Sequence, residues 1–191
     1  LNIYYQADVT LIKKNKDKDG YFQIDLLSGQ FISAQFVIIC TGVSKNYIPN
    51  IIGIEHTTHY GDLSSDPSEF EDQRVCIIGK GNSGLEVANS ITNVAKYICL
   101  ISHNSPKFAW ESHFVGDTRA VNNDFYDTYQ LKSMAFTADL CNISITKLEN
   151  GKYFIKESNQ YIFDRVINCA GFSFDYSIFD KSIQPEILHD K

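Results

Sequence analysis

The chain has 191 residues, of which 43% are hydrophobic and 21% charged; this is enough apolar material for one or two domains, and it argues against global disorder. The formal net charge of -6 disfavours a nucleic-acid partner, because a phosphate backbone attracts basic surfaces. No run of about 18 apolar residues is present, so we expect no transmembrane segment.

Residues 1–42 predict an antiparallel β meander. Strands are expected at 8–14, 21–27 and 31–40, with a hairpin turn at Asp19-Gly20 between the first two. The third strand ends in the apolar run 36–40, which we expect to be buried. Because the sequence is already strand-like at Leu1, we expect the chain to be a piece of a longer protein.

Residues 43–72 contain Pro49, Gly53, Gly61 and Pro67 and predict a connecting segment with little regular structure and a domain boundary. Residues 74–102 then predict a strand, a glycine turn, a helix with apolar residues at helical spacing, and a second strand. This order is typical of a parallel sheet with a crossover helix.

The rest of the chain is less regular. A helix is expected within 122–136, a hairpin over 141–158 that turns at Asn150-Gly151, and a strand over 161–171. The five cysteines include no Cys-x-x-Cys pair, and their spacings fit no zinc site. Four of them lie inside or at the ends of apolar runs, and we expect these to be buried as small hydrophobic residues: Cys40, Cys76, Cys99 and Cys169.

The glycine turn predicts a dinucleotide site. Gly79, Gly81 and Gly84 fit Gly-x-Gly-x-x-Gly, in which the first glycine allows the sharp exit from the strand and the second lets a pyrophosphate approach the backbone. The third lets the helix pack closely, and phosphates bind at the helix N-terminus. The predicted site also includes the other residues of the turn, Lys80, Asn82 and Ser83, and a plain glycine turn is the alternative.

The end of the second strand indicates which dinucleotide binds. An NAD site usually has Asp or Glu there to bond the ribose 2′-OH. This strand ends in Ser102 and His103, followed by Lys107, with no carboxylate, so we favour NADPH. An ordinary exposed loop is the alternative, and Arg119 is a further candidate. Glu86 is included in the site and is expected in the first turn of the helix, where the dipole favours an acid.

Two other segments resemble parts of two-dinucleotide flavoproteins such as the flavin-containing monooxygenases. Residues 37–42, which end in Thr41 and Gly42, are similar to the strand and turn where those proteins pass from the FAD domain to the NAD(P) domain. Residues 164–172, with Gly171, are similar to the return crossing, and the glycine motif lies between the two. The resemblance implies FAD as a second cofactor in the full-length protein, near these crossings.

Residues 110–133 and 174–179 are similar to the family of FAD-dependent oxidoreductase domain-containing protein 2. This resemblance implies an FAD- and NADPH-dependent oxidoreductase of the endoplasmic reticulum lumen, associated with ER-associated degradation components and misfolded glycoproteins; a cytoplasmic location is the alternative. His113 and Asp117 are a tempting acid–base pair, but a structural polar pair is the preferred interpretation, and we assign no catalytic residue.

We therefore expect the α/β fold class: a Rossmann-like NAD(P)-binding domain with a parallel sheet over 49–164, flanked by antiparallel β segments of an incomplete FAD-binding domain at 1–48 and 165–191. The predicted function is NADPH binding for hydride transfer to flavin, with the fragment inactive alone. The alternatives are a non-catalytic NADPH-binding interaction module that recruits ER degradation partners, a generic flavin-containing monooxygenase, and a dehydrogenase without flavin.

Overall fold

The computed structural model of the chain divides into two compact units, which are described separately. The first unit comprises Leu1–Lys45 and Phe172–Lys191, and the second unit comprises Asn46–Gly171. The structure describes residues 3–43, 45–105, 135–156 and 162–185. Among these, no helix is both long and apolar enough to cross a membrane.

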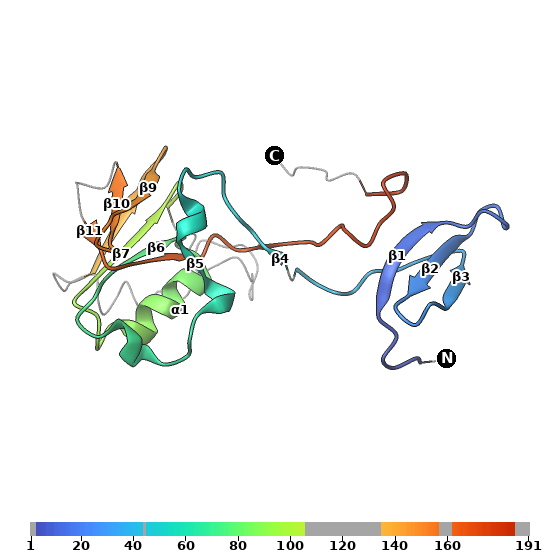
Figure 1. Cartoon of the computed structure of the whole chain (residues 1–191), viewed down its shortest axis with the longest axis horizontal. Coiled ribbons are helices and arrows are strands. Elements are labelled where there is room, and N and C mark those ends of the chain that lie inside the picture. The colour runs from blue at the N-terminus through green and yellow to red at the C-terminus, as the bar shows by residue number, and fades with distance from the viewer. Residues whose placement is uncertain (1–2, 44, 106–134, 157–161, 186–191) are drawn as a thin grey trace, which may run out of the picture. The chain divides into compact units, whose positions relative to one another are not determined.

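The first unit contains the predicted β meander. Strands β1 (Val9–Lys14), β2 (Phe22–Leu26) and β3 (Phe31–Ala34) form an antiparallel sheet in that order (Figure 1). The β1–β2 hairpin turns at the predicted place, where Gly20 has a φ of 73° that favours glycine. Across this pair the Lys13 ammonium lies 2.6 Å from the Asp25 carboxylate.

The prediction of a buried strand through residues 36–40 is wrong. β3 ends at Ala34, and the Phe36 and Ile38 side chains are 84% and 86% exposed. Cys40 is also exposed, contrary to expectation. An apolar strand is buried on both faces only when other elements cover it, and this run belongs to none of the described strands.

The second unit is built on a five-stranded parallel sheet with the strand order β5-β12-β6-β7-β8. The predicted strand–turn–helix–strand unit is confirmed as β6, α1 (Asn82–Ile91) and β7. The strands of this sheet, in chain order, are β5 (Thr58–His59), β6 (Arg74–Ile78), β7 (Tyr97–Ser102), β8 (Ala135–Asp139) and β12 (Arg165–Asn168).

Apart from Arg74 at the start of β6 and Ser102 at the end of β7, these two neighbouring strands are apolar, as expected for strands that are covered on both faces. Side chains alternate along β6, so Val75 and Ile77 pack in the cluster that includes α1, whereas Cys76 and Ile78 pack on the opposite face. Each fully buried side chain of this size contributes about 1.5–3 kcal/mol. Cys76, Cys99 and Cys169 are buried, as predicted.

The opposite face is covered by a second antiparallel sheet, in which β9 (Ser144–Lys147) and β11 (Ile162–Phe163) flank β10 (Tyr153–Lys156). The predicted hairpin between β9 and β10 is confirmed. The predicted strand 161–171 is instead two strands, β11 and β12, interrupted at Asp164. The Asp164 carboxylate accepts hydrogen bonds from the Arg74 backbone N–H and from Lys152, both at 2.8 Å, which fastens this turn to the start of β6.

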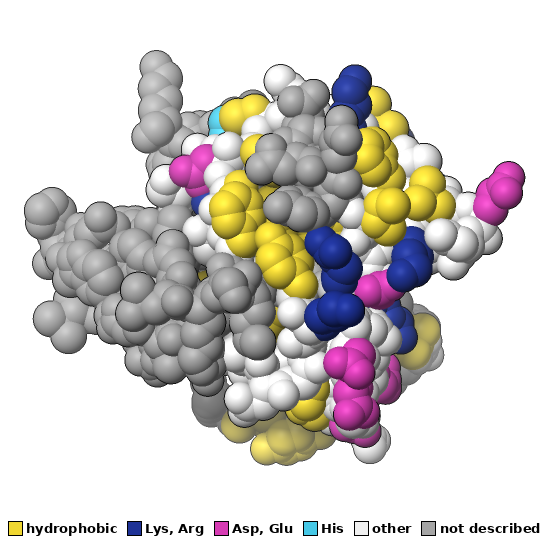
Figure 2. Space-filling model, turned by 90° about the vertical axis from the view of Figure 1, so that its left-hand side faces the viewer, with side chains coloured by type: hydrophobic (Ala, Val, Ile, Leu, Met, Phe, Trp, Pro, Cys, Tyr) yellow, Lys and Arg dark blue, Asp and Glu magenta, His cyan; other side chains and the backbone are white. Residues whose placement is uncertain are grey.

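A shallow depression of about 320 Å³ lies at this amino edge of the sheet, lined mainly by charged residues. On the face shown in Figure 2, Lys and Arg side chains gather beside Asp and Glu side chains. The basic and acidic residues that line the depression are Arg74, Lys96, Lys152, Arg165, Asp72 and Asp164. Within this depression Lys152 pairs with Asp164, and the Arg165 Nε donates to the Gln73 side-chain oxygen over 3.3 Å.

Residues 43–72 are more regular than predicted. They contain β5 inside the main sheet, the short strand β4 (Lys45–Asn46), which pairs with β13 (Phe172–Ser173), and three 3₁₀ turns, η1 (Ile54–His56), η2 (Tyr60–Asp62) and η3 (Pro67–Phe70). The compact units divide after residues 45 and 171 rather than after 48 and 164. β12 therefore belongs to the second unit, because it pairs between β5 and β6. The assignment of the first unit to FAD binding stays a prediction.

Candidate functional site

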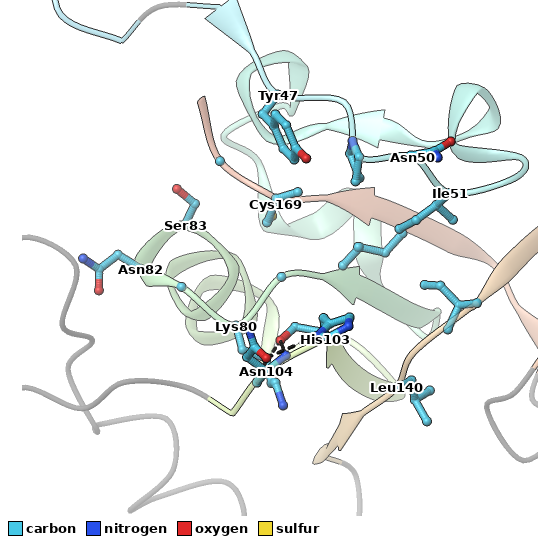
Figure 3. Close-up of a pocket in the computed structure, with 18 of the residues that line it drawn as sticks. Tyr47, Asn50, Ile51, Lys80, Asn82, Ser83, His103, Asn104, Leu140 and Cys169 are labelled. Carbon is cyan, nitrogen blue, oxygen red and sulfur yellow. Dashed lines mark hydrogen bonds between the residues drawn. The ribbon is translucent and has the colours of Figure 1, made fainter. Parts of the chain in front are cut away.

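The carboxyl ends of β6, β7 and β12 meet at one edge of the parallel sheet and open onto a pocket of about 780 Å³ (Figure 3). Such an edge is where open α/β sheets bind ligands. All of the lining residues belong to the second unit: Tyr47, Pro49–Ile51, Ile78–Ser83, Ser102–Asn104, Leu140, Asn142, Ile143 and Cys169–Gly171.

The three glycines of the motif have different physical roles. Gly79 has a φ of 117°, and a Cβ there would lie 2.3 Å from the Cys169 carbonyl oxygen. A Cβ on Gly84 would lie 2.3 Å from the Gly79 carbonyl oxygen, so this glycine permits the close helix–turn contact. A Cβ on Gly81 would meet no atom within 4 Å. Packing therefore requires two of the glycines, whereas Gly81 leaves open space at the pocket.

That open space lies at the start of α1. Gly81 is the N-cap of the helix and provides no side-chain hydrogen bond to the first turn. The first N–H groups of a helix have no partner within it and carry the positive end of its dipole. Asn82 and Ser83 also line the pocket. These residues fit a pyrophosphate group, because a bare backbone and a helix N-terminus face the same cavity.

The loop after β7 supplies polar groups to the pocket. Ser102 and His103 lie there as predicted, joined by Asn104. The His103 Nδ1 lies 3.2 Å from the Asn104 side-chain oxygen, and the Asn104 backbone N–H donates to the Ser102 hydroxyl over 3.2 Å. In Figure 3, His103 and Asn104 lie beside Lys80, while Tyr47 and Cys169 lie across the cavity. These bonds hold the loop in one shape.

Lys80 lines the pocket, but its ammonium group is not presented to solvent. Its side chain is 3% exposed and forms an ion pair with Asp139, at the end of β8. The sequence did not identify Asp139, because a helix rather than a strand was predicted just before it. Parallel pairing places Asp139 beside Ser102.

The segments after β12 and before β5 form the opposite wall. The buried Asn168 side chain donates to the Tyr47 carbonyl oxygen over 3.3 Å and accepts from the Ala170 backbone N–H over 3.0 Å. The Tyr47 backbone N–H donates to the Gly171 carbonyl oxygen over 3.0 Å. Burial raises the pKa of the Cys169 thiol to about 12, so this cysteine is a poor nucleophile at neutral pH.

Glu86 was predicted to lie in the first turn of α1. It lies in the second turn instead, because the helix begins at Asn82. Its carboxylate accepts a hydrogen bond from the Tyr60 hydroxyl over 3.0 Å. This bond, and the negative charge of Glu86, raise the pKa of Tyr60 above its ordinary value. Glu86 therefore fastens η2 to the helix, and it does not line the pocket at the glycine turn.

The remaining predicted residues differ in where they lie. Thr41 and Gly42 belong to the first unit and are exposed, so their predicted role in FAD binding stays a prediction. Lys107, Arg119, His113 and Asp117 lie outside the described residues. Gly171 lines the pocket and has a φ of 105°.

Sequence reasoning also missed part of the pocket wall. Tyr47, Pro49–Ile51, Leu140, Asn142 and Ile143 come from two segments that carry no motif. The backbone brings them there, because the Ile145 N–H donates to the Ile52 carbonyl oxygen over 2.8 Å. Gly53 allows this approach, since a Cβ there would lie 1.9 Å from the Ile145 carbonyl oxygen.

Known proteins are similar to this chain in fold and in sequence. The flavin-containing monooxygenase from Stenotrophomonas maltophilia superposes with a TM-score of 0.69 at 21% identity, over 97% of this chain and 58% of that one, which shows a Rossmann-like α/β fold. FAD-dependent oxidoreductase domain-containing protein 2 from Mus musculus is 31% identical over 96% of this chain and 32% of its own length, and the Danio rerio protein is 31% identical over 97% and 34%.

The chain thus spans about a third of the length of the curated relatives that it matches. The family model described as pyridine nucleotide-disulphide oxidoreductase matches residues 1–189, almost the whole chain. Its match includes the glycine turn, the helix after it and the polar loop that together form the pocket. The chain belongs to the pyridine nucleotide-disulphide oxidoreductase family.

Proposed function

We propose that the second unit binds NADPH in the pocket at the glycine turn. The observation that carries this proposal is the open space at Gly81. Gly79 and Gly84 are required by the backbone and by packing, but no described atom needs the absence of a side chain at Gly81. A glycine at the mouth of a pocket, next to a helix N-terminus, is what a pyrophosphate needs to approach the backbone.

The polar loop favours the 2′-phosphorylated dinucleotide. β7 ends in Ser102, His103 and Asn104, which line the pocket and include no carboxylate. Hydroxyl, amide and imidazole groups can donate to a phosphate, whereas an NAD site usually offers a carboxylate to the ribose 2′-OH.

In the full-length protein we propose an FAD-dependent oxidoreductase in which bound NADPH supplies a hydride to the flavin. This extension rests on family membership and on the curated relatives, whose names describe FAD-dependent oxidoreductases. The residues of this chain bind and orient the nicotinamide dinucleotide. Gly79–Ser83 would hold the pyrophosphate. The wall formed by the segments before β5 and after β12, which includes Tyr47 and Cys169, would close the side of the pocket opposite Lys80 and His103.

The test is calorimetric titration of the chain with NADPH and with NADH, with the Gly81→Asp variant as the control. We expect NADPH to bind at least tenfold more tightly than NADH. Gly81→Asp should abolish binding, because it places a negative charge where the pyrophosphate approaches. A folded chain that binds neither dinucleotide would contradict the proposal.

The resemblance leads to a further proposal about the full-length protein, namely a place in the endoplasmic reticulum lumen and association with misfolded glycoproteins. Protease protection in sealed microsomes tests the proposed location directly. Lumenal protein is degraded only after detergent is added, whereas cytoplasmic protein is degraded before.

A further inference from the structure

Lys80 occupies an unusual position for a charged residue. Among the described residues it is the one charged member of the buried set, with a side chain that is 3% exposed. It stands between Gly79 and Gly81, in the turn proposed to bind phosphates. A lysine there is expected to reach toward the anion, yet its ammonium group is held by Asp139 instead.

Asp139 is engaged at both of its oxygens. Oδ1 pairs with the Lys80 ammonium, and Oδ2 accepts a hydrogen bond from the Ser105 hydroxyl over 2.7 Å. These two bonds, that from Lys80 first, lower the pKa of Asp139, so the carboxylate is charged at neutral pH. Asp139 therefore ties the glycine turn to the loop that follows β7.

The position of this carboxylate matters for the choice of dinucleotide. Asp139 ends β8 directly beside Ser102, which ends β7. In NAD sites a carboxylate at the end of the second strand accepts the ribose 2′-OH. Here the neighbouring strand brings a carboxylate to the same edge, where its negative charge would repel a 2′-phosphate, which carries about −1.5 to −2 charge.

We propose that the Lys80–Asp139 pair, together with Ser105, determines the preference of the site for a 2′-phosphorylated adenine nucleotide. Lys80 cancels the negative charge of Asp139, and the Lys80 and Ser105 bonds engage both carboxylate oxygens, which leaves them less available to a ribose hydroxyl. This inference rests on the proposed nucleotide binding. It concerns the adenosine end of the ligand, so mononucleotides can test it.

The probes are 5′-AMP and the same nucleotide with an added 2′-phosphate, titrated into the full 191-residue chain. The measured quantity is the ratio of their dissociation constants. Lys80→Met should lower the preference for the 2′-phosphate about tenfold, because it leaves Asp139 charged and free of its cation. Asp139→Asn should raise the preference at least threefold. The double variant should return close to the wild-type ratio, because it removes both charges.

Lys152→Met is the matched control. It removes a lysine that also pairs with a carboxylate in this unit, 2.8 Å from Asp164, but at the amino edge of the sheet. The affinity ratio should not change. Far-UV circular dichroism checks that each variant is folded, and if Lys80→Met is not, the Asp139→Asn result decides.

The outcomes separate this inference from the proposed function. A wild-type chain that binds neither mononucleotide would overturn this inference, whereas the proposed function is overturned only if NADPH and NADH also fail to bind. A wild-type chain that binds, with variants that weaken both nucleotides by the same factor, would show a purely structural pair and overturn the inference alone. An unchanged ratio in Asp139→Asn would also overturn it.

Discussion

Gly79 and Gly81 stand two residues apart in one turn, but the structure predicts opposite consequences of changing each to alanine. Gly79 has a φ of 117°, a region that costs a non-glycine residue about 1–3 kcal/mol. Its new Cβ would lie 2.3 Å from the Cys169 carbonyl oxygen, and relieving such a clash costs about 1–3 kcal/mol more. Gly79→Ala should therefore lose about 2–6 kcal/mol of stability.

Gly81 has a φ of −84°, which alanine adopts without strain, and its Cβ would enter open space. Alanine is a poorer N-cap than glycine, by about 0.5–1 kcal/mol, but it lowers the entropy of the unfolded chain by about 0.4–1 kcal/mol. The two effects nearly cancel. Gly81→Ala should keep its stability to within about 0.5 kcal/mol while it loses at least tenfold in NADPH affinity, or about 1.4 kcal/mol.

Urea unfolding followed by circular dichroism measures the stabilities, and calorimetry measures the affinities. The reasoning predicts a crossed result, in which Gly79→Ala is unstable and Gly81→Ala is stable but binds poorly. If Gly81→Ala binds NADPH as well as the wild type does, the open space at Gly81 is not a phosphate site. If Gly79→Ala is as stable as the wild type, the close approach to Cys169 is not as described.

Three further predictions concern the rest of the molecule. Because Glu86 raises the pKa of Tyr60, this pair contributes its full stability below about pH 10, and that stability is lost as the pH rises through the folded-state pKa of Tyr60. Urea unfolding should therefore show that Tyr60→Phe loses less free energy of unfolding than the wild type does above about pH 10. Gly53→Ala should lower the urea midpoint markedly, because its Cβ would overlap the Ile145 carbonyl oxygen, and an unchanged midpoint would refute this contact. A thiol reagent should label two cysteines per folded chain by mass spectrometry, Cys40 and Cys141, and labelling of a third before unfolding would contradict the burial of the others.

The strand–turn–helix–strand unit could be predicted from the sequence because its signals are local. Apolar residues run from Val75 to Ile78 in β6 and from Tyr97 to Ile101 in β7, and the glycines mark the turn between β6 and α1. The hairpin turns at Gly20 and Gly151 were recognised for the same reason, since glycine favours the positive φ values found there.

The errors arose where burial depends on distant partners. The run 36–40 has the composition of a core strand, but it pairs with none of the described strands and Phe36 is exposed. Asp139 is placed beside Ser102, at the carboxyl edge of the sheet, only through the pairing of β8 with β7, which no local pattern revealed. Lys80 was predicted to belong to the phosphate-binding turn, but its ion-pair partner, Asp139, could not be identified without knowing that β8 pairs with β7.

The central claim is that NADPH binds at the carboxyl edge of the parallel sheet in the second unit. Backbone amide shifts in an isotope-labelled chain, followed by NMR during NADPH titration, test it most directly. We predict saturable shifts that concentrate at Gly79–Ser83, Ser102–Asn104 and Ala170–Gly171, the pocket-lining backbone. Shifts that concentrate instead on the β9–β10 hairpin or in the first unit, or no saturable shifts at all, would contradict the account.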